Sequence, residues 1–317
     1  MLLGFGAAAL LPGRAWADVI VRPPDREAMV PVEGGRVYVR INGRLDGPRP
    51  PILMIHGGPG STHAAFINAL GLADERALIL YDQLDSGRSD RPGNEANWRV
   101  SRFVDEIDAI RRTLGLARLH VLGASWGGTV ALEYGARRPQ GLASLILESP
   151  LVSTRSWLAD AAALRRELPA ATQALLTRCE TPAPPPQPQC EDATNSFYHA
   201  FNRRMPTPAP TTAYARALPV PFNRRLYETM WGASEFTSTG SLRNYDGEPL
   251  LARLDGARTL FIGGQYDEAR PATLAGFAAR VPGASFAVIE DAAHSIWNDN
   301  PGAMLATMRR WLARHDS

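Results

Sequence analysis

Leu119-His-Val-Leu-Gly-Ala-Ser-Trp-Gly-Gly128 carries the strongest structural signal in this chain of 317 residues. Its first four residues form an apolar run typical of a buried strand, and a stretch with helical spacing begins at Gly127. Between them, Gly123-Ala-Ser-Trp-Gly127 fits the pattern G-x-S-x-G, which places a serine on a tight strand-to-helix turn. Glycines allow the backbones to pack closely around such a turn. We therefore predict that Ser125 is a nucleophile.

Strands and helices alternate on both sides of this turn. Arg36–Ile41 alternates in polarity, as a half-exposed antiparallel strand does. Continuous apolar runs, typical of strands buried on both faces, are Pro51–Ile55, Ala77–Tyr81, Leu119–Leu122, Ser144–Leu147, Thr259–Ile262 and Ser285–Ile289. Helices are expected at Val100–Leu114, Gly127–Arg137, Ala272–Arg280 and Pro301–Arg314. This pattern predicts an α/β fold with a mostly parallel, doubly wound sheet.

The alternation is interrupted once. Residues 151–245 contain no buried-strand run, but many prolines, arginines and aromatic residues with helical stretches between them. We expect one α/β catalytic domain, formed by residues 18–150 and 246–317, with a mainly helical cap domain at 151–245.

An acid and a base follow the last two predicted strands. The next-to-last predicted strand is followed by Gly263-Gly-Gln-Tyr-Asp267, and the last one by Glu290-Asp-Ala-Ala-His294. Carboxyl ends of parallel strands meet at one edge of the sheet, and the order Ser, acid, His is that of a hydrolase with a nucleophile elbow. The predicted triad is therefore Ser125, Asp267 and His294. Asp291 is the rival acid, but it lies only three residues before the histidine.

The glycine-rich turn His56-Gly-Gly-Pro-Gly60 follows the first buried strand. Acyl transfer needs N–H donors aimed at the developing oxyanion. We assign that role to the N–H groups of Gly58 and Trp126, with Gly57 as the alternative donor and a substrate contact.

Composition excludes several other classes. The chain has 34 basic residues, all arginine, against 32 acidic ones, and the arginines are scattered, so no nucleic-acid partner is expected. No His/Cys/Asp cluster has metal-ligand spacing and no turn resembles a nucleotide site, so neither metal nor cofactor is expected. His120 lies inside a strand and is interpreted as a core residue. A monomer is the default expectation.

The N-terminus suggests export. Leu2–Leu11 is apolar but too short to span a bilayer, and Ala15-Trp-Ala17 has the form of a signal-peptidase site, although no positive charge precedes the apolar run. We interpret residues 1–17 as a remnant of an export signal, with a packed N-terminal arm as the alternative. The protein is then periplasmic or secreted, and otherwise cytoplasmic. Cys179 and Cys190 flank a proline-rich loop, which favours one disulfide over two unrelated thiols.

Together these motifs resemble the proline iminopeptidase family of serine aminopeptidases, an α/β-hydrolase family. The resemblance begins near residue 30 and includes the cap. The motifs that carry it are His56–Gly60, Tyr81-Asp-Gln83, Gly87-Arg-Ser89, Gly123–Gly128, Glu235–Gly240, Gly264–Glu268 and Ala293-His294. The sequence is also similar to tricorn-interacting aminopeptidases and to L-amino acid amidases. Departures are Ala124, where many members have glycine, and Asp85-Ser86 in place of a Gly-Cys pair.

The resemblance implies removal of an N-terminal residue, often proline, from short peptides, amides or arylamides through an acyl-enzyme. It also implies that Glu235 and Glu268 bind the substrate's α-ammonium, since two carboxylates around one cation neutralise it and locate the scissile carbonyl. An amidase or carboxylesterase with the same triad is the alternative, and a hydrolase-fold binding protein is a third. We interpret four aromatic residues as part of the core of the cap rather than as lining of a substrate pocket: Phe197, Tyr198, Tyr227 and Trp231.

Overall fold

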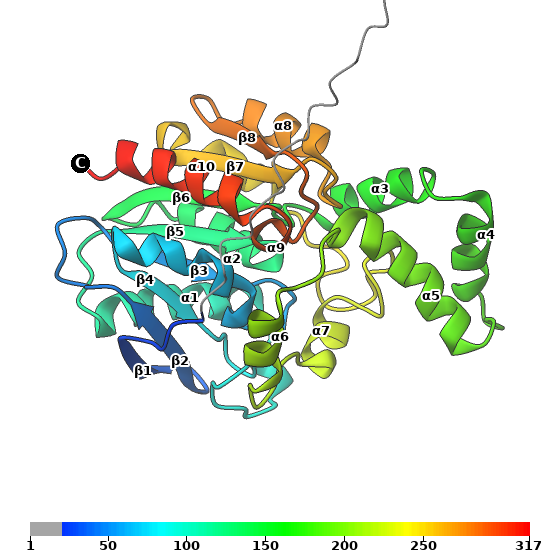
Figure 1. Ribbon diagram of the computed structural model, residues 1–317, viewed down its shortest axis with the longest axis horizontal. Coiled ribbons are helices and arrows are strands. Elements are labelled where there is room, and N and C mark those ends of the chain that lie inside the picture. The colour runs from blue at the N-terminus through cyan, green and yellow to red at the C-terminus, as the bar shows by residue number, and fades with distance from the viewer. Residues whose placement is uncertain (1–20) are drawn as a thin grey trace, which may run out of the picture.

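The computed structural model describes residues 21–317, and within them it forms one eight-stranded sheet in the order β1-β2-β4-β3-β5-β6-β7-β8 (Figure 1). β1 and β2 run antiparallel to their neighbours, and all the other pairs are parallel. The strands are β1 Arg26–Val32, β2 Gly35–Asn42, β3 Ile52–Ile55, β4 Leu78–Tyr81, β5 Leu119–Ala124, β6 Leu142–Glu148, β7 Thr259–Gly264 and β8 Ser285–Ile289. The predicted mostly parallel sheet is confirmed.

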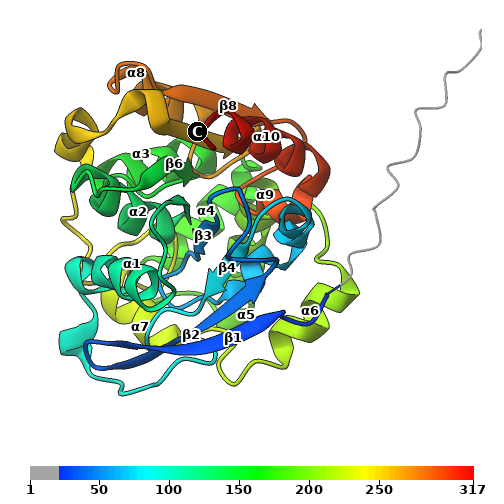
Figure 2. The same ribbon diagram turned by 90° about the vertical axis from the view of Figure 1, so that its left-hand side faces the viewer.

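Both faces of the sheet are buried because alternate residues of its central strands point into two different cores. Leu53 and Ile55 of β3 belong to one core, whereas Ile52 and Met54 belong to the other. The first core is closed by α1 (Val100–Thr113), α2 (Trp126–Ala136) and α8 (Pro271–Ala279). The second is closed by η1 (His63–Asp74), α9 (Ile296–Asp299) and α10 (Pro301–Arg314), which lie on the opposite side in Figure 2.

Strand β1 was not expected from the sequence. Only Val30 of its seven residues is fully buried, so it has neither a continuous apolar run nor clear alternation. Gly34 adopts φ +89° in the turn between β1 and β2, and pairing with β2 defines the strand. Because β1 lies at the edge of the sheet, its sequence lacks the apolar pattern by which a strand is predicted.

The helical insertion lies between β6 and the short helices η4 (Glu248–Arg253) and η5 (Gly256–Arg258). Its elements are α3 Thr154–Arg165, α4 Ala170–Cys179, α5 Gln187–Phe197, the π-helical turn η3 Tyr198–Asn202, α6 Ala209–Arg216 and α7 Arg224–Met230. All of them fall within residues 151–245. Helices α4 and α5 project away from the sheet (Figure 1) and share a small core of their own with the end of α3, which includes Leu164, Leu176 and Phe197.

The structure joins Cys179, at the end of α4, to Cys190 in α5 by a disulfide. The proline-rich segment between them is shorter than the loop we expected, because α5 already begins at Gln187. Pro188 lies in the first turn of α5, where a missing N–H costs no helical hydrogen bond.

The interpretation of residues 1–17 as an export signal concerns residues outside the described part of the chain. Among residues 21–317, no helix is long and apolar enough to cross a membrane.

Candidate active site

Ser125 lies on the turn between β5 and α2, at the carboxyl end of the sheet's central strands. Its φ of 56° and ψ of −120° are unfavourable for a residue with a side chain. Backbone hydrogen bonds hold it there: its N–H donates to Glu148 O (2.9 Å), and its carbonyl accepts from Gly128 (2.9 Å) and Leu151 (3.1 Å). The surrounding strands therefore maintain a strained turn that presents the hydroxyl at the edge of the sheet.

Glycine is required on both sides of this turn. A Cβ atom on Gly123 would lie 2.0 Å from the carbonyl oxygen of Gly127, and one on Gly127 would lie 2.1 Å from that of Ile55. Both contacts are with backbone, so neither can be relieved by a side-chain rotation. Ala124, the departure from the resembling family's pattern, is only partly buried and packs at the margin of the second core.

We predict that Gly123→Ala lowers the free energy of unfolding by at least about 2 kcal/mol, because the elbow must open to admit the methyl group. The control is Gly276→Ala in α8, where an added Cβ meets nothing within 4 Å. That change is expected to be neutral or stabilising by up to about 1 kcal/mol, since alanine favours a helix over glycine. Urea unfolding of the three proteins measures both effects, and equal stabilities would contradict the packing argument.

Asp267 and His294 form a hydrogen-bonded pair on the loops that follow β7 and β8. His294 Nδ1 lies 2.8 Å from Asp267 Oδ1. The carboxylate of Asp267 is buried, and its oxygens also accept from Ala269 N–H (2.9 Å), from Gly264 N–H (3.0 Å) and from the Ser149 hydroxyl. Because these donors fix the carboxylate, it can fix the orientation of the imidazole in turn.

Carboxylates surround the imidazole on several sides. Burial alone would lower the pKa of His294, but Asp267, Glu268 and Glu235 together raise it to about 10. Glu148, buried at the end of β6, also faces this region: burial raises its pKa to about 8, and its Oε2 accepts from the Trp297 indole at 2.9 Å. The site is therefore strongly favourable for a positive charge.

The two glutamates of the resemblance both act electrostatically on this imidazole. Glu268 Oε1 lies 3.6 Å from His294 Nε2 and accepts from Asn202 Nδ2 at 2.6 Å. Glu235, on the loop after α7, accepts from the Tyr227 hydroxyl at 2.6 Å. Burial raises the pKa of both glutamates, and the charge of the neighbouring His294 opposes that increase. The cap thus supplies one of the carboxylates and a partner for the other.

The glycine-rich turn after β3 lies against the nucleophile. A Cβ atom on Gly57 would be 3.0 Å from Ser125 Cβ and 3.5 Å from its Oγ, whereas one on Gly58 would meet the backbone of Gly60 and Ser61. Gly57 is thus the residue that leaves room beside Ser125. The peptide bond between Gly58 and Pro59 is cis.

Two buried side chains brace this turn against the elbow. His56 Nε2 accepts from the backbone N–H of Gln83 (3.1 Å), and its Nδ1 donates to Gly57 O (3.0 Å). Burial lowers the pKa of His56 to about 4, so the ring is neutral at physiological pH. The amide of Gln83 donates to His56 O (2.8 Å) and accepts from the indole of Trp126 (2.8 Å). The turn and the residue after the nucleophile are therefore connected.

Several site residues were missed by reasoning from the sequence: His56, Gln83, Ser149 and Asn202. Gln83 belongs to the motif Tyr81-Asp-Gln83, which carried a family signal but no assigned role. Nothing local marks Asn202, because its role arises from the packing of η3 against the loops of the triad. There Phe201 O accepts from the N–H groups of Glu268 (3.0 Å) and His294 (3.2 Å).

The aromatic residues of the cap divide into two groups. Phe197 and Trp231 are buried in cap and domain cores, as interpreted. Tyr227 is also buried, but its hydroxyl binds Glu235, and the electrostatic neighbours of Tyr198 include both glutamates. The last two therefore face the site with their polar ends.

Two other histidines, His120 and His63, have structural partners. His120 is buried with its Nδ1 2.8 Å from Ser144 Oγ, in agreement with its interpretation as a core residue. His63 is buried between Asp82 (2.8 Å) and the Tyr214 hydroxyl of α6 (2.7 Å). Residues 21–317 contain no group of three or more His, Cys, Asp or Glu side chains arranged to hold a metal ion.

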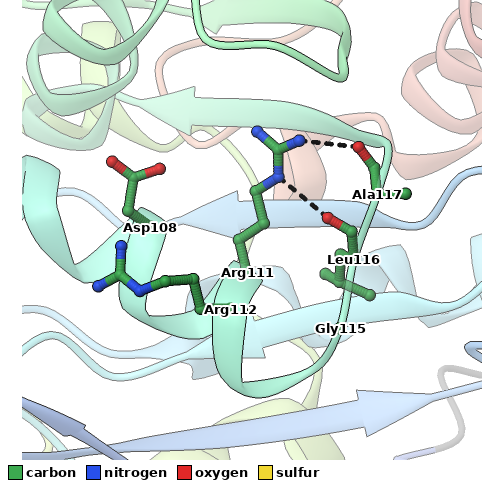
Figure 3. Close-up of a pocket in the computed structure, with 6 residues that line it drawn as sticks. All are labelled: Asp108, Arg111, Arg112, Gly115, Leu116 and Ala117. Carbon is green, nitrogen blue, oxygen red and sulfur yellow. Dashed lines mark hydrogen bonds between the residues drawn. The ribbon is translucent and has the colours of Figure 1, made fainter.

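A surface hollow between the end of α1 and the start of β5 is unrelated to this chemistry (Figure 3). It lies beside the amino end of β5, whereas Ser125 follows the carboxyl end. Arg111, one of its lining side chains, donates hydrogen bonds to the carbonyls of Leu116 (3.0 Å) and Ala117 (2.7 Å). We therefore assign this hollow no part in the reaction.

The strand order, the nucleophile elbow and the Asp–His pair define an α/β hydrolase, and the α/β hydrolase fold family model matches residues 50–301. Two proline iminopeptidases are similar along almost their whole length. The one from Heyndrickxia coagulans is 35% identical over 90% of this chain and 98% of its own, and that from Levilactobacillus brevis is 34% identical over 92% and 97%. The chain belongs to the proline iminopeptidase family of α/β hydrolases.

Solved structures agree with this assignment. The crystal structure of a proline iminopeptidase from Mycobacterium smegmatis has a TM-score of 0.81 and 33% identity, and covers 92% of this chain and 99% of its own. The crystal structure of VinJ gives a TM-score of 0.83 at 32% identity, with 92% and 100% covered. An esterase from Thermogutta terrifontis is 21% identical with a TM-score of 0.61, which shows the shared fold alone.

Proposed function

We propose that this hydrolase is a serine aminopeptidase that removes an N-terminal residue, with proline as the preferred one, from short peptides, amides or arylamides. The observation that carries the proposal is the pair Glu235 and Glu268 beside His294. Among residues 21–317, no arginine forms an ion pair with either glutamate. Carboxylates in such surroundings are suited to a cation brought by the substrate, and a free α-ammonium is that cation.

The proposed mechanism assigns one task to each group. His294 Nε2 takes the proton of Ser125 Oγ as the hydroxyl attacks the scissile carbonyl, and Asp267 keeps the Nδ1–H tautomer and stabilises the imidazolium. The N–H groups of Gly58 and Trp126 receive the oxyanion, with Gly57 as the neighbouring donor. His294 then protonates the leaving amine. Water, deprotonated by the same imidazole, releases the amino acid from Ser125.

The preference for proline rests on the relatives from Heyndrickxia coagulans and Levilactobacillus brevis, which both bear the name proline iminopeptidase. The ammonium site explains why an N-terminal residue is chosen, because two carboxylates at a fixed position locate the first peptide carbonyl at the nucleophile. An amidase or an esterase has the same triad. An amino acid amidase would also use the glutamates, whereas an esterase of simple acyl groups needs neither.

We predict that Glu235→Ala lowers kcat/KM for a prolyl arylamide by about 10- to 100-fold, the loss of one charge-assisted hydrogen bond. Hydrolysis of p-nitrophenyl acetate, which has no ammonium, should not fall. Glu228→Ala is the matched control, because Glu228 is an exposed glutamate of α7 paired with Arg224. Equal effects of the Glu235 change on both substrates would favour the esterase alternative and would remove the assigned role of this glutamate.

Export remains our proposal for localisation, and a disulfide in the cap is compatible with an oxidising compartment. N-terminal sequencing of the protein from its native host is expected to find a mature chain that lacks residues 1–17. A mature chain that retains Met1 would contradict export through this segment.

A further inference from the structure

The imidazole of His294 has a carboxylate at each of its two nitrogens. Asp267 lies at Nδ1 (2.8 Å), as an acid in a triad should, and Glu268 lies at Nε2 (3.6 Å). Nε2 is the atom that must accept the serine proton, so it has to be unprotonated when the reaction begins. A carboxylate at this position favours the opposite state, in which Nε2 carries a proton.

The charged neighbours of the ring act in the same direction. The ring of Trp157 packs against it in a T-shaped arrangement, with ring centroids 5.6 Å apart. The titratable groups that face it or its loop are Asp267 and Glu268 after β7, Glu235 from the cap, Glu148 from β6 and Asp299 from α9, which accepts from the Ala293 N–H. In the free enzyme burial lowers the pKa of His294, but Asp267, Glu268 and Glu235 raise it to about 10.

One oxygen of the Glu268 carboxylate is also available to a further hydrogen-bond donor. The side chain is 3% exposed, and Asn202 occupies Oε1, which is the same oxygen that faces His294. The other oxygen, Oε2, is buried and has no hydrogen-bond partner. Buried carboxylate oxygens without a partner are costly, so this atom marks a position that a donor from the substrate would fill.

We infer, on the basis of the proposed aminopeptidase function, that Glu268 couples recognition of the substrate's ammonium to activation of the base. In the free enzyme Glu268 keeps a proton on His294 Nε2. When the ammonium binds Glu268 and Glu235, its charge replaces that of the imidazolium, and the Nε2 proton leaves to solvent. Nε2 is then free to take the proton of Ser125 Oγ. One cation enters and one proton departs, so the charge of the site is conserved.

This coupling makes the ammonium a condition for catalysis as well as for binding. The sign follows from the neighbours of His294: burial lowers its pKa, and part of the opposing increase comes from Glu268 and Glu235. Once a bound ammonium compensates these two charges, the pKa of His294 must fall. A substrate without an ammonium leaves the histidine protonated at neutral pH, so its hydrolysis is slow even where it binds.

The test is Glu268→Gln, with kcat/KM measured from pH 6 to pH 10 on a prolyl arylamide and on p-nitrophenyl acetate. The arylamide rate is expected to fall at least about 10-fold, and the ester rate at pH 7 to rise at least about 10-fold, since each unit by which the pKa falls increases the neutral imidazole about 10-fold. The acidic limb of the ester profile should move to lower pH. Glu167→Gln, an exposed cap glutamate, controls for the change in net charge and should alter neither rate.

The outcomes separate the two proposals. If the arylamide rate falls while the ester rate and its acidic limb stay unchanged, the coupling is overturned and the aminopeptidase function stands. If neither rate changes, Glu268 binds no ammonium, and both proposals lose their support.

A second measurement needs no change at Glu268. In Ser125→Ala protein labelled with ¹⁵N-histidine, the chain has only six histidines to assign. At pH 7.5 the His294 ring should be an imidazolium in the free protein and a neutral Nδ1–H tautomer with L-prolinamide bound. The same protonation state before and after binding would overturn the coupling alone. Absence of L-prolinamide binding would overturn the ammonium site itself.

Discussion

Ser125→Ala is expected to reduce kcat on a prolyl arylamide by at least about 10⁴-fold while leaving the fold intact. Removal of the nucleophile from a serine hydrolase leaves only the contribution of binding and of the oxyanion hole. The backbone of Ser125 is held at φ 56° by hydrogen bonds from its own peptide groups, and these do not depend on the hydroxyl. Alanine can therefore occupy the same strained turn.

Parallel assays of activity and thermal unfolding check this result. Ser196→Ala is the control, because that hydroxyl lies on exposed helix α5 and bonds only within its own helix, to Asp192 O at 2.9 Å. It should retain wild-type activity. If Ser125→Ala kept more than about one per cent of kcat with an unchanged unfolding temperature, another group would have to be the nucleophile.

The sequence predicts the strands of the sheet well where both faces of a strand are buried. Runs such as Ile52–Ile55 and Leu78–Tyr81 are fully buried in the structure, so nearly every residue in them is apolar and the pattern is unambiguous. Strand β1 and helix η1 have no such signal: β1 is an edge strand, and η1 is a long 3-10 helix that begins at His63. Pairing with β2 defines β1, and packing against the rest of the fold defines η1. Neither element can therefore be predicted from the local periodicity of the sequence.

For the site, the position of a residue after a strand was the informative feature. Asp267 and His294 follow β7 and β8, and parallel strands bring their carboxyl ends to one edge, so chain order alone placed the pair correctly. The partners of the glutamates were not predictable in this way. Asn202 reaches Glu268 because the cap folds back on the sheet, a contact between residues 66 positions apart in the chain.

The cap therefore helps to position the residues of the site as well as to cover them. The π-helical turn η3 accepts backbone hydrogen bonds from the loops that carry both Glu268 and His294, and Asn202 O accepts from the Ser295 N–H at 2.7 Å. The position of this turn therefore determines where Glu268, the proposed ammonium ligand, lies relative to the base. Variation in the cap can alter substrate choice without any change in the triad.

Asp267→Asn is expected to lower kcat by about 10⁴-fold and the free energy of unfolding by roughly 1–3 kcal/mol, because a buried backbone N–H loses its acceptor. The carboxylate of Asp267 accepts from His294, Ala269 and Gly264 as well as from the Ser149 hydroxyl. An amide has one acceptor oxygen, so its NH₂ group must face either His294 Nδ1 and the Ala269 N–H or the Gly264 N–H and the Ser149 hydroxyl. If it faces His294 Nδ1, the ring is forced into the Nε2–H tautomer, which cannot take a proton from Ser125.

The change also removes one of the largest contributions that raise the pKa of His294, so the acidic limb of the pH–rate profile should move toward lower pH. Asp291→Asn is the matched control. Asp291 is the rival acid three residues before the histidine, and asparagine tolerates its φ of 56° better than most residues do. Measured on a prolyl arylamide between pH 6 and pH 10, the control should stay within about threefold of wild type. A large loss in Asp291→Asn, with activity retained in Asp267→Asn, would assign the acid of the triad to the other loop.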